Sequence, residues 1–344
     1  MKKKAKYNVA VVGVGVVGIE MLRVLKQRNF PIAQLRVLAR SSRSISVDGE
    51  TYAVEAVSPD SFKGVDIALF AGTEGEKGAA VTYAPEAIKR GAVVIDNGAD
   101  FRMAKNVPLV VPEVNAKDVA RHKGIIANPN CSTIQMVVAL WPIYKKAGIK
   151  RIIVTTLQAS SGAGKTAVEQ LKNETTQIVA GGFENLQANV AQKGMPQQLS
   201  FNVFPHIGTF AECDYTNEEW KLVKETHKIM HDAKIKISAT TVRVPVRTGH
   251  SESVYIETKK TIAPALVKKL LASSPGIKVI DDPKNNLYPM PKDVEGKDDT
   301  FVGRIRKDCF VKNGLWLWVV ADNLRKGAAT NAVQIAECLI SNSK

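Results

Sequence analysis

The sequence contains few cysteines and no long apolar run. Its 344 residues include four cysteines, which are scattered and form no C-x-x-C pair, as is typical of proteins in a reducing compartment. The longest apolar stretch, residues 9–19, has eleven residues and three glycines, whereas a membrane-spanning helix needs about 20 apolar residues. We therefore expect a cytoplasmic protein without a disulfide framework or a membrane-spanning helix.

Acidic residues are outnumbered by basic ones. The chain has 33 Asp and Glu against 48 Lys and Arg, which gives a formal net charge of +15. Such a charge favours anionic partners, either nucleic acid or small phosphorylated ligands. The basic residues form no single long block, and no zinc finger or aromatic-rich strand motif accompanies them. We therefore expect a small anionic ligand, with neither nucleic acid nor a membrane as partner.

The apolar pattern changes near Cys131. Before it, short apolar strands alternate with helices, which is typical of a doubly wound parallel sheet. We expect these strands at residues 8–12, 35–39, 67–70, 93–95, 109–111 and 125–127. After it, longer and more β-branched strands predict a mixed or antiparallel sheet, covered on one face by helices. These strands are expected at residues 151–157, 236–246, 253–258, 301–307 and 315–321, and the helices at 163–180, 217–230 and 263–272.

The length also indicates two domains, because 344 residues exceed what one hydrophobic core usually holds. The sequence therefore predicts an α/β fold with an N-terminal Rossmann-type domain over residues 1–130, completed by a C-terminal helix at 323–344. Residues 131–322 would form the catalytic and substrate domain. Cys131 then lies at the predicted junction of the two domains.

A glycine-rich turn follows the first predicted strand. The chain reads G-x-G-x-x-G between that strand and a helix, and the glycines allow a tight turn and a close approach of backbone to a pyrophosphate at the helix N-terminus. The alternative is a glycine-rich turn that binds nothing. The residues expected to bind the dinucleotide are Gly13, Gly15, Val16, Val17 and Gly18.

The residues after the second predicted strand favour NADP over NAD. NAD-binding proteins usually carry an acidic residue there, which hydrogen-bonds the ribose. This chain has Arg40, Ser42, Arg43 and Ser44 instead, so guanidinium and hydroxyl groups would meet a 2′-phosphate and no carboxylate would repel it. The alternative is that these residues only solvate a loop.

Cys131 lies in the segment N-P-N-C-S-T, directly before an amphipathic helix at residues 134–146. Ser132 or Thr133 is expected to cap this helix, which places the thiol at its positive end, where the dipole and unpaired amides stabilise a thiolate. The alternative, a small core residue, fits the polar surroundings less well. Cys131 is therefore the predicted nucleophile.

A thiolate nucleophile needs an acid/base partner, and histidine is the usual choice. His250 lies at a strand end and turn within residues 243–253, a position that holds a side chain on a rigid edge. The other four histidines form no Glu-x-x-His pattern, and no third metal-binding residue accompanies any pair of them. We therefore expect no metal site.

Residues 159–166 offer a competing interpretation, because they nearly match the P-loop G-x-x-x-x-G-K-[ST]. Ala159 replaces the first glycine, and the segment lies mid-chain behind another nucleotide motif. We therefore expect no nucleotide hydrolysis that depends on Lys165.

Six segments, in the same order and over nearly the whole chain, resemble the aspartate-semialdehyde dehydrogenase family. They lie at residues 128–133, 158–164, 202–207, 215–221, 243–252 and 322–329. The second reads Q-A-S-S-G-A-G, which accounts for the near-match to a P-loop. The glycine turn departs from the family pattern G-A-T-G-A-V-G by being one residue shorter.

The resemblance implies a reaction and partners. The reaction is the NADPH-dependent reductive dephosphorylation of L-aspartyl 4-phosphate to L-aspartate 4-semialdehyde. It belongs to the biosynthesis of lysine and diaminopimelate, threonine and methionine. The implied ligands are the acyl phosphate or semialdehyde and phosphate, and the implied assembly is a homodimer, with a tetramer as the alternative.

The resemblance also implies roles for single residues. Cys131 would displace phosphate to form a thioester, His250 would be the general acid/base, and Gln158 would orient the acyl intermediate. Arg243 would bind the carboxylate of the substrate and Glu218 its ammonium group. Lys221 and Arg102 would bind phosphate, with Asn130 nearby. The residues that would contact the cofactor are Ser161, Gly162 and Asn323. Without the resemblance, Arg102 and Lys221 would be interpreted as surface charges, or Lys221 as the salt-bridge partner of Glu218.

Other functions remain open at this point. N-acetyl-γ-glutamyl-phosphate reductase shares the two-domain plan, but its cysteine follows glycine and precedes tyrosine, whereas the neighbours here are Asn130 and Ser132. A sugar-phosphate aldehyde dehydrogenase is more remote. A nucleotide sensor without catalysis would leave Cys131 and His250 unexplained, and a nucleic-acid binder would retain DNA in a strongly salt-dependent way.

Overall fold

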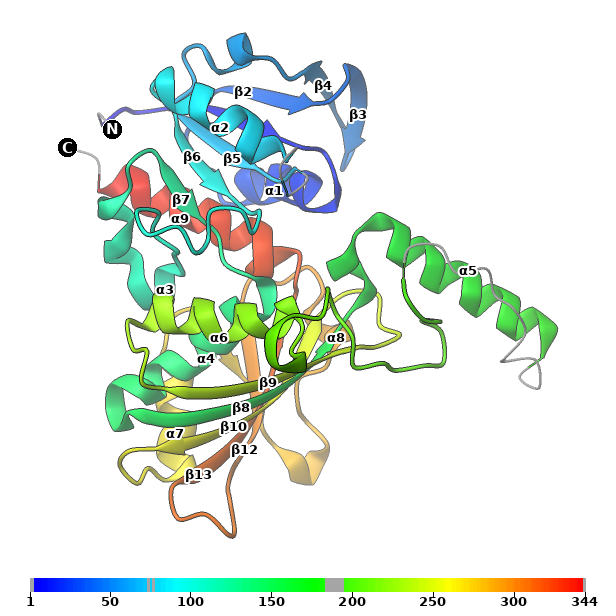
Figure 1. The fold of residues 1–344 in the computed structure, drawn as a ribbon, viewed down its shortest axis with the longest axis vertical. Helices are drawn as coiled ribbons and strands as arrows, with labels where there is room; N and C mark the ends of the chain where they lie inside the picture. The colour runs from blue at the N-terminus through cyan, green and yellow to red at the C-terminus, as the bar shows by residue number, and fades with distance from the viewer. Residues whose placement is uncertain (1–2, 73–74, 76–77, 183–194, 343–344) are drawn as a thin grey trace. The chain divides into compact units, whose positions relative to one another are not determined.

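The computed structural model of the chain describes residues 3–72, 75, 78–182 and 195–342 and divides into two compact units (Figure 1). Unit 1 comprises Met1–Ile134, Lys228–Met230 and Gly327–Lys344, and unit 2 comprises Gln135–His227 and His231–Lys326. Within the described part of the chain, no helix has both the length and the apolar character needed to cross a membrane.

Unit 1 contains a seven-stranded sheet with the order β3-β4-β2-β1-β5-β6-β7. All neighbouring strands are parallel except β3 and β4, which form an antiparallel hairpin. This confirms the predicted doubly wound parallel sheet, apart from the antiparallel hairpin of β3 and β4. The strands are β1 (Tyr7–Val12), β2 (Ile32–Ala39), β3 (Arg43–Val47), β4 (Glu50–Ala56), β5 (Ile67–Phe70), β6 (Val93–Asp96) and β7 (Ile125–Ala127).

Two details of unit 1 differ from the sequence prediction. The expected strand at residues 109–111 is reduced to a single bridge between Leu109 and Ala127. The hairpin of β3 and β4 was not expected, because its residues are mostly exposed and polar and carry no apolar strand signal. Part of the predicted cofactor loop, Arg43 and Ser44, is therefore the start of a strand.

Helices cover both faces of this sheet (Figure 1). Val9 and Val11 of β1 face the apolar cluster that includes the C-terminal helix, whereas Ala10 and Val12 face the cluster that includes α2. This alternation follows from the period of two residues in a strand that is buried on both sides. The helices are α1 (Val16–Gln27), α2 (Ala79–Lys89), the short α3 (Pro112–Asn115) and α9 (Thr330–Ser341), which a π-helical turn at Arg325–Ala329 precedes.

Unit 2 contains a six-stranded mixed sheet with the order β11-β12-β13-β10-β8-β9. β8 pairs with β9, and β11 with β12, in parallel, and the other neighbours are antiparallel. The predicted mixed sheet is thus confirmed. The strands are β8 (Ile149–Gln158), β9 (Lys236–Arg243), β10 (His250–Thr258), β11 (Ile277–Val279), β12 (Thr300–Lys307) and β13 (Gly314–Ala321).

The helices of unit 2 do not all cover the sheet. α4 and α6 run along one face, whereas α5 extends away from the sheet, so the prediction that it covers the sheet was wrong (Figure 1). α5 instead follows a short 3₁₀ turn at Ser160–Ala163 and packs through Ala167 on Leu199 and Phe204. The helices are α4 (Cys131–Ala147), α5 (Lys165–Gly181), α6 (Asn217–Met230), α7 (Pro264–Ala272) and α8 (Pro291–Val294).

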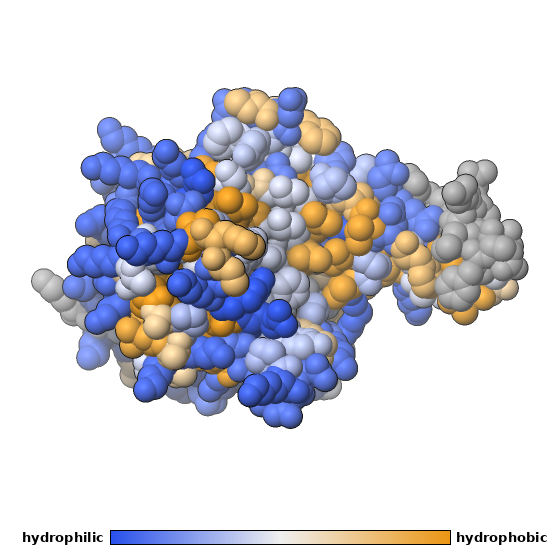
Figure 2. Space-filling model, turned by 90° about the horizontal axis from the view of Figure 1, so that it is seen from below, coloured by the Kyte–Doolittle hydropathy of each residue, from blue (hydrophilic) through white to orange (hydrophobic). Residues whose placement is uncertain are grey.

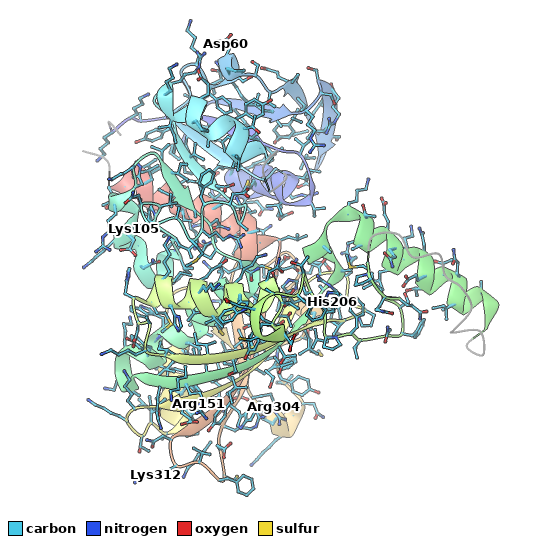
Figure 3. The ribbon with its side chains drawn as sticks, in the orientation of Figure 1. Asp60, Lys105, Arg151, His206, Arg304 and Lys312 are labelled. Carbon is cyan, nitrogen blue, oxygen red and sulfur yellow. The ribbon has the colours of Figure 1, made fainter. Side chains whose placement is uncertain are left out.

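On the face drawn in Figure 2, hydrophobic patches lie between hydrophilic regions. In unit 2, the turn between β12 and β13 carries Phe310, whose side chain is 97% exposed. On the same unit, Arg151 (labelled in Figure 3) forms an ion pair with Glu257 at 3.2 Å.

Candidate active site

Among the histidines that the structure describes, His250 alone is completely buried. His206, labelled in Figure 3, is only partly buried and stacks on Phe210 in the segment before α6. The backbone N–H of Ala159 donates to Nδ1 of His250 at 3.0 Å, so the neutral ring carries its proton on Nε2. Burial and the nearby Arg243 cation lower the pKa of His250 to about 3, against the opposing effect of Glu218. The ring is therefore neutral at physiological pH and presents an N–H donor.

The position of this ring depends on a small network of neighbouring residues. Gly249, directly before it, has a φ of +94° and donates its N–H to Oδ1 of Asn323 at 2.9 Å. Asn323 in turn donates its amide to the Ser161 hydroxyl at 2.9 Å. A Cβ added at Gly162 would lie 3.0 Å from Cε1 of His250, so a larger residue there would crowd the ring. Ser161, Gly162 and Asn323, the predicted cofactor residues of unit 2, thus support the His250 turn.

Gln158 and Glu218 come together from a strand end and a helix. Gln158 is the last residue of β8, and its Nε2 donates to Oε1 of Glu218 at 3.2 Å. Lys221, one turn further along α6, donates to the other carboxylate oxygen at 3.1 Å. The buried carboxylate is therefore held by an amide and an ammonium group, and the salt bridge considered from the sequence is present.

Arg243 lies beside Gln158, because β8 and β9 run in parallel and these two residues pair in the register. Its guanidinium is buried, and Nη1 donates to the carbonyl oxygen of Ala159 at 2.6 Å. β10 runs antiparallel to β8, so the start of β10 meets the ends of β8 and β9 at one edge of the sheet. The predicted residues His250, Gln158, Arg243 and Glu218 are thus gathered at that edge.

Cys131 is the first residue of α4 and is partly exposed. The Oδ1 atom of Asn130 accepts hydrogen bonds from the N–H groups of Ser132, at 3.1 Å, and Thr133, at 3.3 Å. The prediction that Ser132 or Thr133 caps the helix was therefore wrong, and Asn130 is the cap. The thiol still lies in the first turn, where the helix dipole stabilises negative charge.

Arg102 supports the loop that leads into Cys131. Its side chain is buried, with Nε donating to the carbonyl oxygen of Asn128 at 2.9 Å and Nη2 to that of Asn97 at 2.7 Å. Asn331 of α9 donates to Oδ1 of Asn128 at 2.7 Å. Of these three asparagines, the sequence analysis contained only Asn128, in the N-P-N-C-S-T segment, without a role; no local signal marks Asn97 or Asn331, and Asn331 lies 203 residues from its partner Asn128.

A cavity of about 840 Å³ lies in unit 1 beside the glycine turn. Of the predicted cofactor residues, Gly13, Gly15, Arg40 and Arg43 line it. The turn needs its glycines, because Gly13 has a φ of +101° and a Cβ there would lie 2.7 Å from the carbonyl oxygen of Ala71. The walls are completed by residues that the sequence analysis did not select, among them Ser41, Val57, Thr82 and Tyr83.

Five predicted cofactor residues of unit 1 do not line this cavity. Val16 and Val17 form the first turn of α1, and a Cβ at Gly18 would lie 1.8 Å from the carbonyl oxygen of Gly13, so this glycine lets the helix pack on the turn. Ser42 accepts a hydrogen bond from the N–H of Ala56 at 3.0 Å, and Ser44 lies in β3.

Comparisons with known proteins cover nearly the whole chain. Residues 8–122 match the family model "Semialdehyde dehydrogenase, NAD binding domain", and residues 140–326 match "Semialdehyde dehydrogenase, dimerisation domain". The aspartate-semialdehyde dehydrogenase of Aquifex aeolicus is 55% identical to this chain, and the match covers 97% of this chain and 98% of the relative. That of Bacillus subtilis is 51% identical, over 96% of this chain and 97% of the relative. The crystal structure of aspartate semialdehyde dehydrogenase II from Vibrio cholerae, complexed with ASA, superposes with a TM-score of 0.92 at 43% identity, covering 98% of this chain and 99% of that one. The chain therefore belongs to the aspartate-semialdehyde dehydrogenase family, whose members are oxidoreductases of amino-acid biosynthesis with a nicotinamide cofactor.

Proposed function

We propose that the chain catalyses the NADPH-dependent reductive dephosphorylation of L-aspartyl 4-phosphate to L-aspartate 4-semialdehyde through a thioester on Cys131. The product would serve lysine, diaminopimelate, threonine and methionine biosynthesis in the cytoplasm. The observation that carries the proposal is the group of His250, Gln158, Arg243 and Glu218 at one sheet edge. The complex of the Vibrio cholerae relative with ASA supports the same substrate class.

Two charged groups of opposite sign suit an α-amino acid. The Arg243 guanidinium would bind the α-carboxylate through paired N–H donors, a geometry that a planar fork matches. The Glu218 carboxylate, already held by Gln158 and Lys221, would bind the α-ammonium. A substrate bound at both groups would have the position of its reactive carbonyl carbon fixed.

The first chemical step would use the Cys131 thiolate as the nucleophile. The sulfur would form a bond to the acyl carbon, and the bond from that carbon to the phosphate oxygen would break, with phosphate leaving with the electron pair. The carbonyl oxygen gains negative charge on the way. The Nε2–H of His250 is a donor suited to that oxygen, because Ala159 keeps the ring in this tautomer.

The second step reduces the thioester, and the bound nicotinamide supplies the hydride. His250 would donate the Nε2 proton to the alkoxide oxygen that hydride addition creates, which leaves the ring as an imidazolate, and would take the proton back from the thiohemiacetal hydroxyl as the carbon–sulfur bond breaks and the Cys131 thiolate leaves, so it would act first as an acid and then as a base. Gln158 would orient the acyl group through its amide. Lys221, Arg102 and Asn130 would bind the phosphate group.

The cavity of unit 1 would hold the dinucleotide. Its lining fits that group, because the glycine turn leaves room for close backbone approach and no acidic residue is among the described residues that line it. Arg40 and Arg43 line the same cavity and would pair with a 2′-phosphate, which supports NADP over NAD. Residues 140–326 match the dimerisation domain of the family, so we also propose that a second copy of this chain is the partner.

The test is the phosphate-dependent reduction of NADP⁺ with L-aspartate semialdehyde. Wild type should be active, Cys131→Ala should lose the activity, and the exposed Cys309→Ala should keep it as the matched control. Repeating each assay with NAD⁺ measures the cofactor preference. Activity that survives in Cys131→Ala would exclude the thioester, and turnover of the N-acetylglutamyl semialdehyde in place of the aspartyl one would exclude the proposed substrate.

A further inference from the structure

Glu252 is a buried acid that the proposed mechanism does not use. It lies two residues after His250 on β10, so both side chains are on the same face of the sheet. The side chain is 0% exposed. Its neighbours in the register are Thr156 on β8 and Val319 on β13, and both are also fully buried. An acid placed among such neighbours must be either neutral or strongly compensated.

The surroundings of Glu252 favour the neutral form. Burial raises the pKa of its carboxyl well above the ordinary value of 4.5, and only the amide of Gln135 acts in the opposite direction. Burial and the Gln135 amide are the two influences on this carboxyl, and no charged group is among them. No cation therefore compensates a carboxylate at this position among the described contacts.

Gln135 acts on Glu252, whose pKa its amide lowers, and it also binds the backbone of His250. It is a fully buried residue in the first two turns of α4, and its Nε2 donates to the carbonyl oxygen of His250 at 3.3 Å. Within the described structure, neither its Oε1 nor either carboxyl oxygen of Glu252 has a hydrogen bond of normal geometry. A carboxylate has no proton to offer Oε1, whereas a carboxylic acid supplies an O–H donor.

We propose that Glu252 is a positioning residue: as a neutral acid it donates to Oε1 of Gln135 and thereby holds the amide that binds the His250 carbonyl. The backbone from which the imidazole projects is then fixed on two sides, by Gln135 at the carbonyl of His250 and by Asn323 at the N–H of Gly249. The effect on catalysis rests on the proposed function, because it requires His250 to act on the substrate.

Four single variants, and the double variant of Glu252→Leu with Gln135→Leu, test this chain of contacts. Glu252→Gln keeps the shape and supplies an N–H donor, Glu252→Leu removes the donor, and Gln135→Leu removes the link to His250. Val254→Ala, two residues further along the same face of β10 and also fully buried, is the control for general damage to the core. For each variant, kcat, KM for L-aspartate semialdehyde, the pH profile of kcat/KM and the melting temperature are measured.

The expected pattern separates positioning from stability. Glu252→Gln should keep kcat within about twofold of wild type, with the same pH profile, because the proton donor is retained. Glu252→Leu and Gln135→Leu should each lower kcat by about tenfold or more with little change in KM, because the imidazole is displaced while the groups that bind the substrate are not. The double variant should lose no more than either single one. Val254→Ala should lower the melting temperature without lowering kcat.

A second readout does not depend on turnover. The infrared difference spectrum between wild type and Glu252→Gln at pH 8 should contain the C=O band of a protonated carboxylic acid; carboxylate bands in its place would overturn the inference. Equal kcat in Glu252→Leu and wild type would overturn it too, and if that variant does not fold, Gln135→Leu decides. An inactive wild type with the acid band present would count against the proposed function and not against a neutral Glu252.

Discussion

Arg243 and His250 are bound to the same residue. Nη1 of Arg243 donates to the carbonyl oxygen of Ala159 at 2.6 Å, and the N–H of Ala159 donates to Nδ1 of His250 at 3.0 Å. The group proposed to bind the substrate carboxylate and the proposed acid/base are thus held by one turn at the end of β8. A change in this turn is expected to move both, so substrate binding and proton transfer should respond together.

The low pKa of His250 predicts a pH-dependent stability. The value falls from 6.5 to about 3 on folding, so the folded state disfavours the imidazolium, and the stability present above pH 6.5 is lost as the pH falls towards 3. Between pH 7 and pH 5, wild type should therefore lose about 2 kcal/mol more of its free energy of unfolding than His250→Asn, whose Oδ1 still accepts from Ala159. Urea titrations at both pH values measure this, with the exposed His231→Asn as control. Equal losses in all three proteins would contradict the burial of a neutral ring.

Gly162→Ala should damage catalysis more than folding. The added Cβ would lie 3.0 Å from Cε1 and 3.1 Å from Nε2 of His250, so the ring or the turn must shift by a few tenths of an ångström. We expect kcat to fall by about tenfold or more, because the displaced donor no longer meets the developing charge. Gly181→Ala, where a Cβ meets nothing within 4 Å, is the control in the same kinetic assay. Full activity in Gly162→Ala would show that catalysis does not depend on the exact position of the His250 ring.

Removing the guanidinium groups of the cavity should change the cofactor preference. In the double variant Arg40→Ala with Arg43→Ala, KM for NADPH should rise by about tenfold or more, because hydrogen bonds to a charged group contribute about 1.5–3 kcal/mol each. KM for NADH should change little. Arg36→Ala is the control, since Arg36 binds the carbonyl oxygen of Ser61 and does not line the cavity. A proportional rise in both KM values would place the 2′-phosphate elsewhere.

Asn130→Ala should weaken the start of α4. The variant loses the acceptor for the N–H groups of Ser132 and Thr133, which is expected to cost about 1 kcal/mol of stability. The N–H groups of Ser132 and Thr133 that lose their acceptor should also change the rate at which iodoacetamide alkylates Cys131. This rate is measured as a function of pH. Asn130→Ser, which retains a capping oxygen without adding charge, should stay close to wild type in both measurements. A melting temperature unchanged in Asn130→Ala would show that the cap contributes nothing.

The fold class followed from the sequence because both sheets have strong periodic signals. Residues 9–12 of β1 and all of β5 are continuous apolar runs, as expected for strands buried on both faces, and β13 is a long apolar stretch, whereas β10 is continuously apolar only over residues 254–256. The hairpin of β3 and β4 escaped prediction because its side chains are mostly exposed, so no apolar pattern marks it. α5 has the sequence of a helix, but nothing local indicates that it leaves the sheet (Figure 1).

The sequence by itself determined which chemical groups the chain carries: a cysteine at a helix start, a glycine turn after a buried strand, and a basic loop after the second strand. Only the tertiary structure decided their state. Ala159 and His250 are 91 residues apart, yet their hydrogen bond selects the tautomer, and Gln135 reaches the His250 carbonyl over 115 residues. Tautomer, protonation and burial depend on the neighbours that sheet pairing brings together, and the local pattern of residues contains no information about those neighbours.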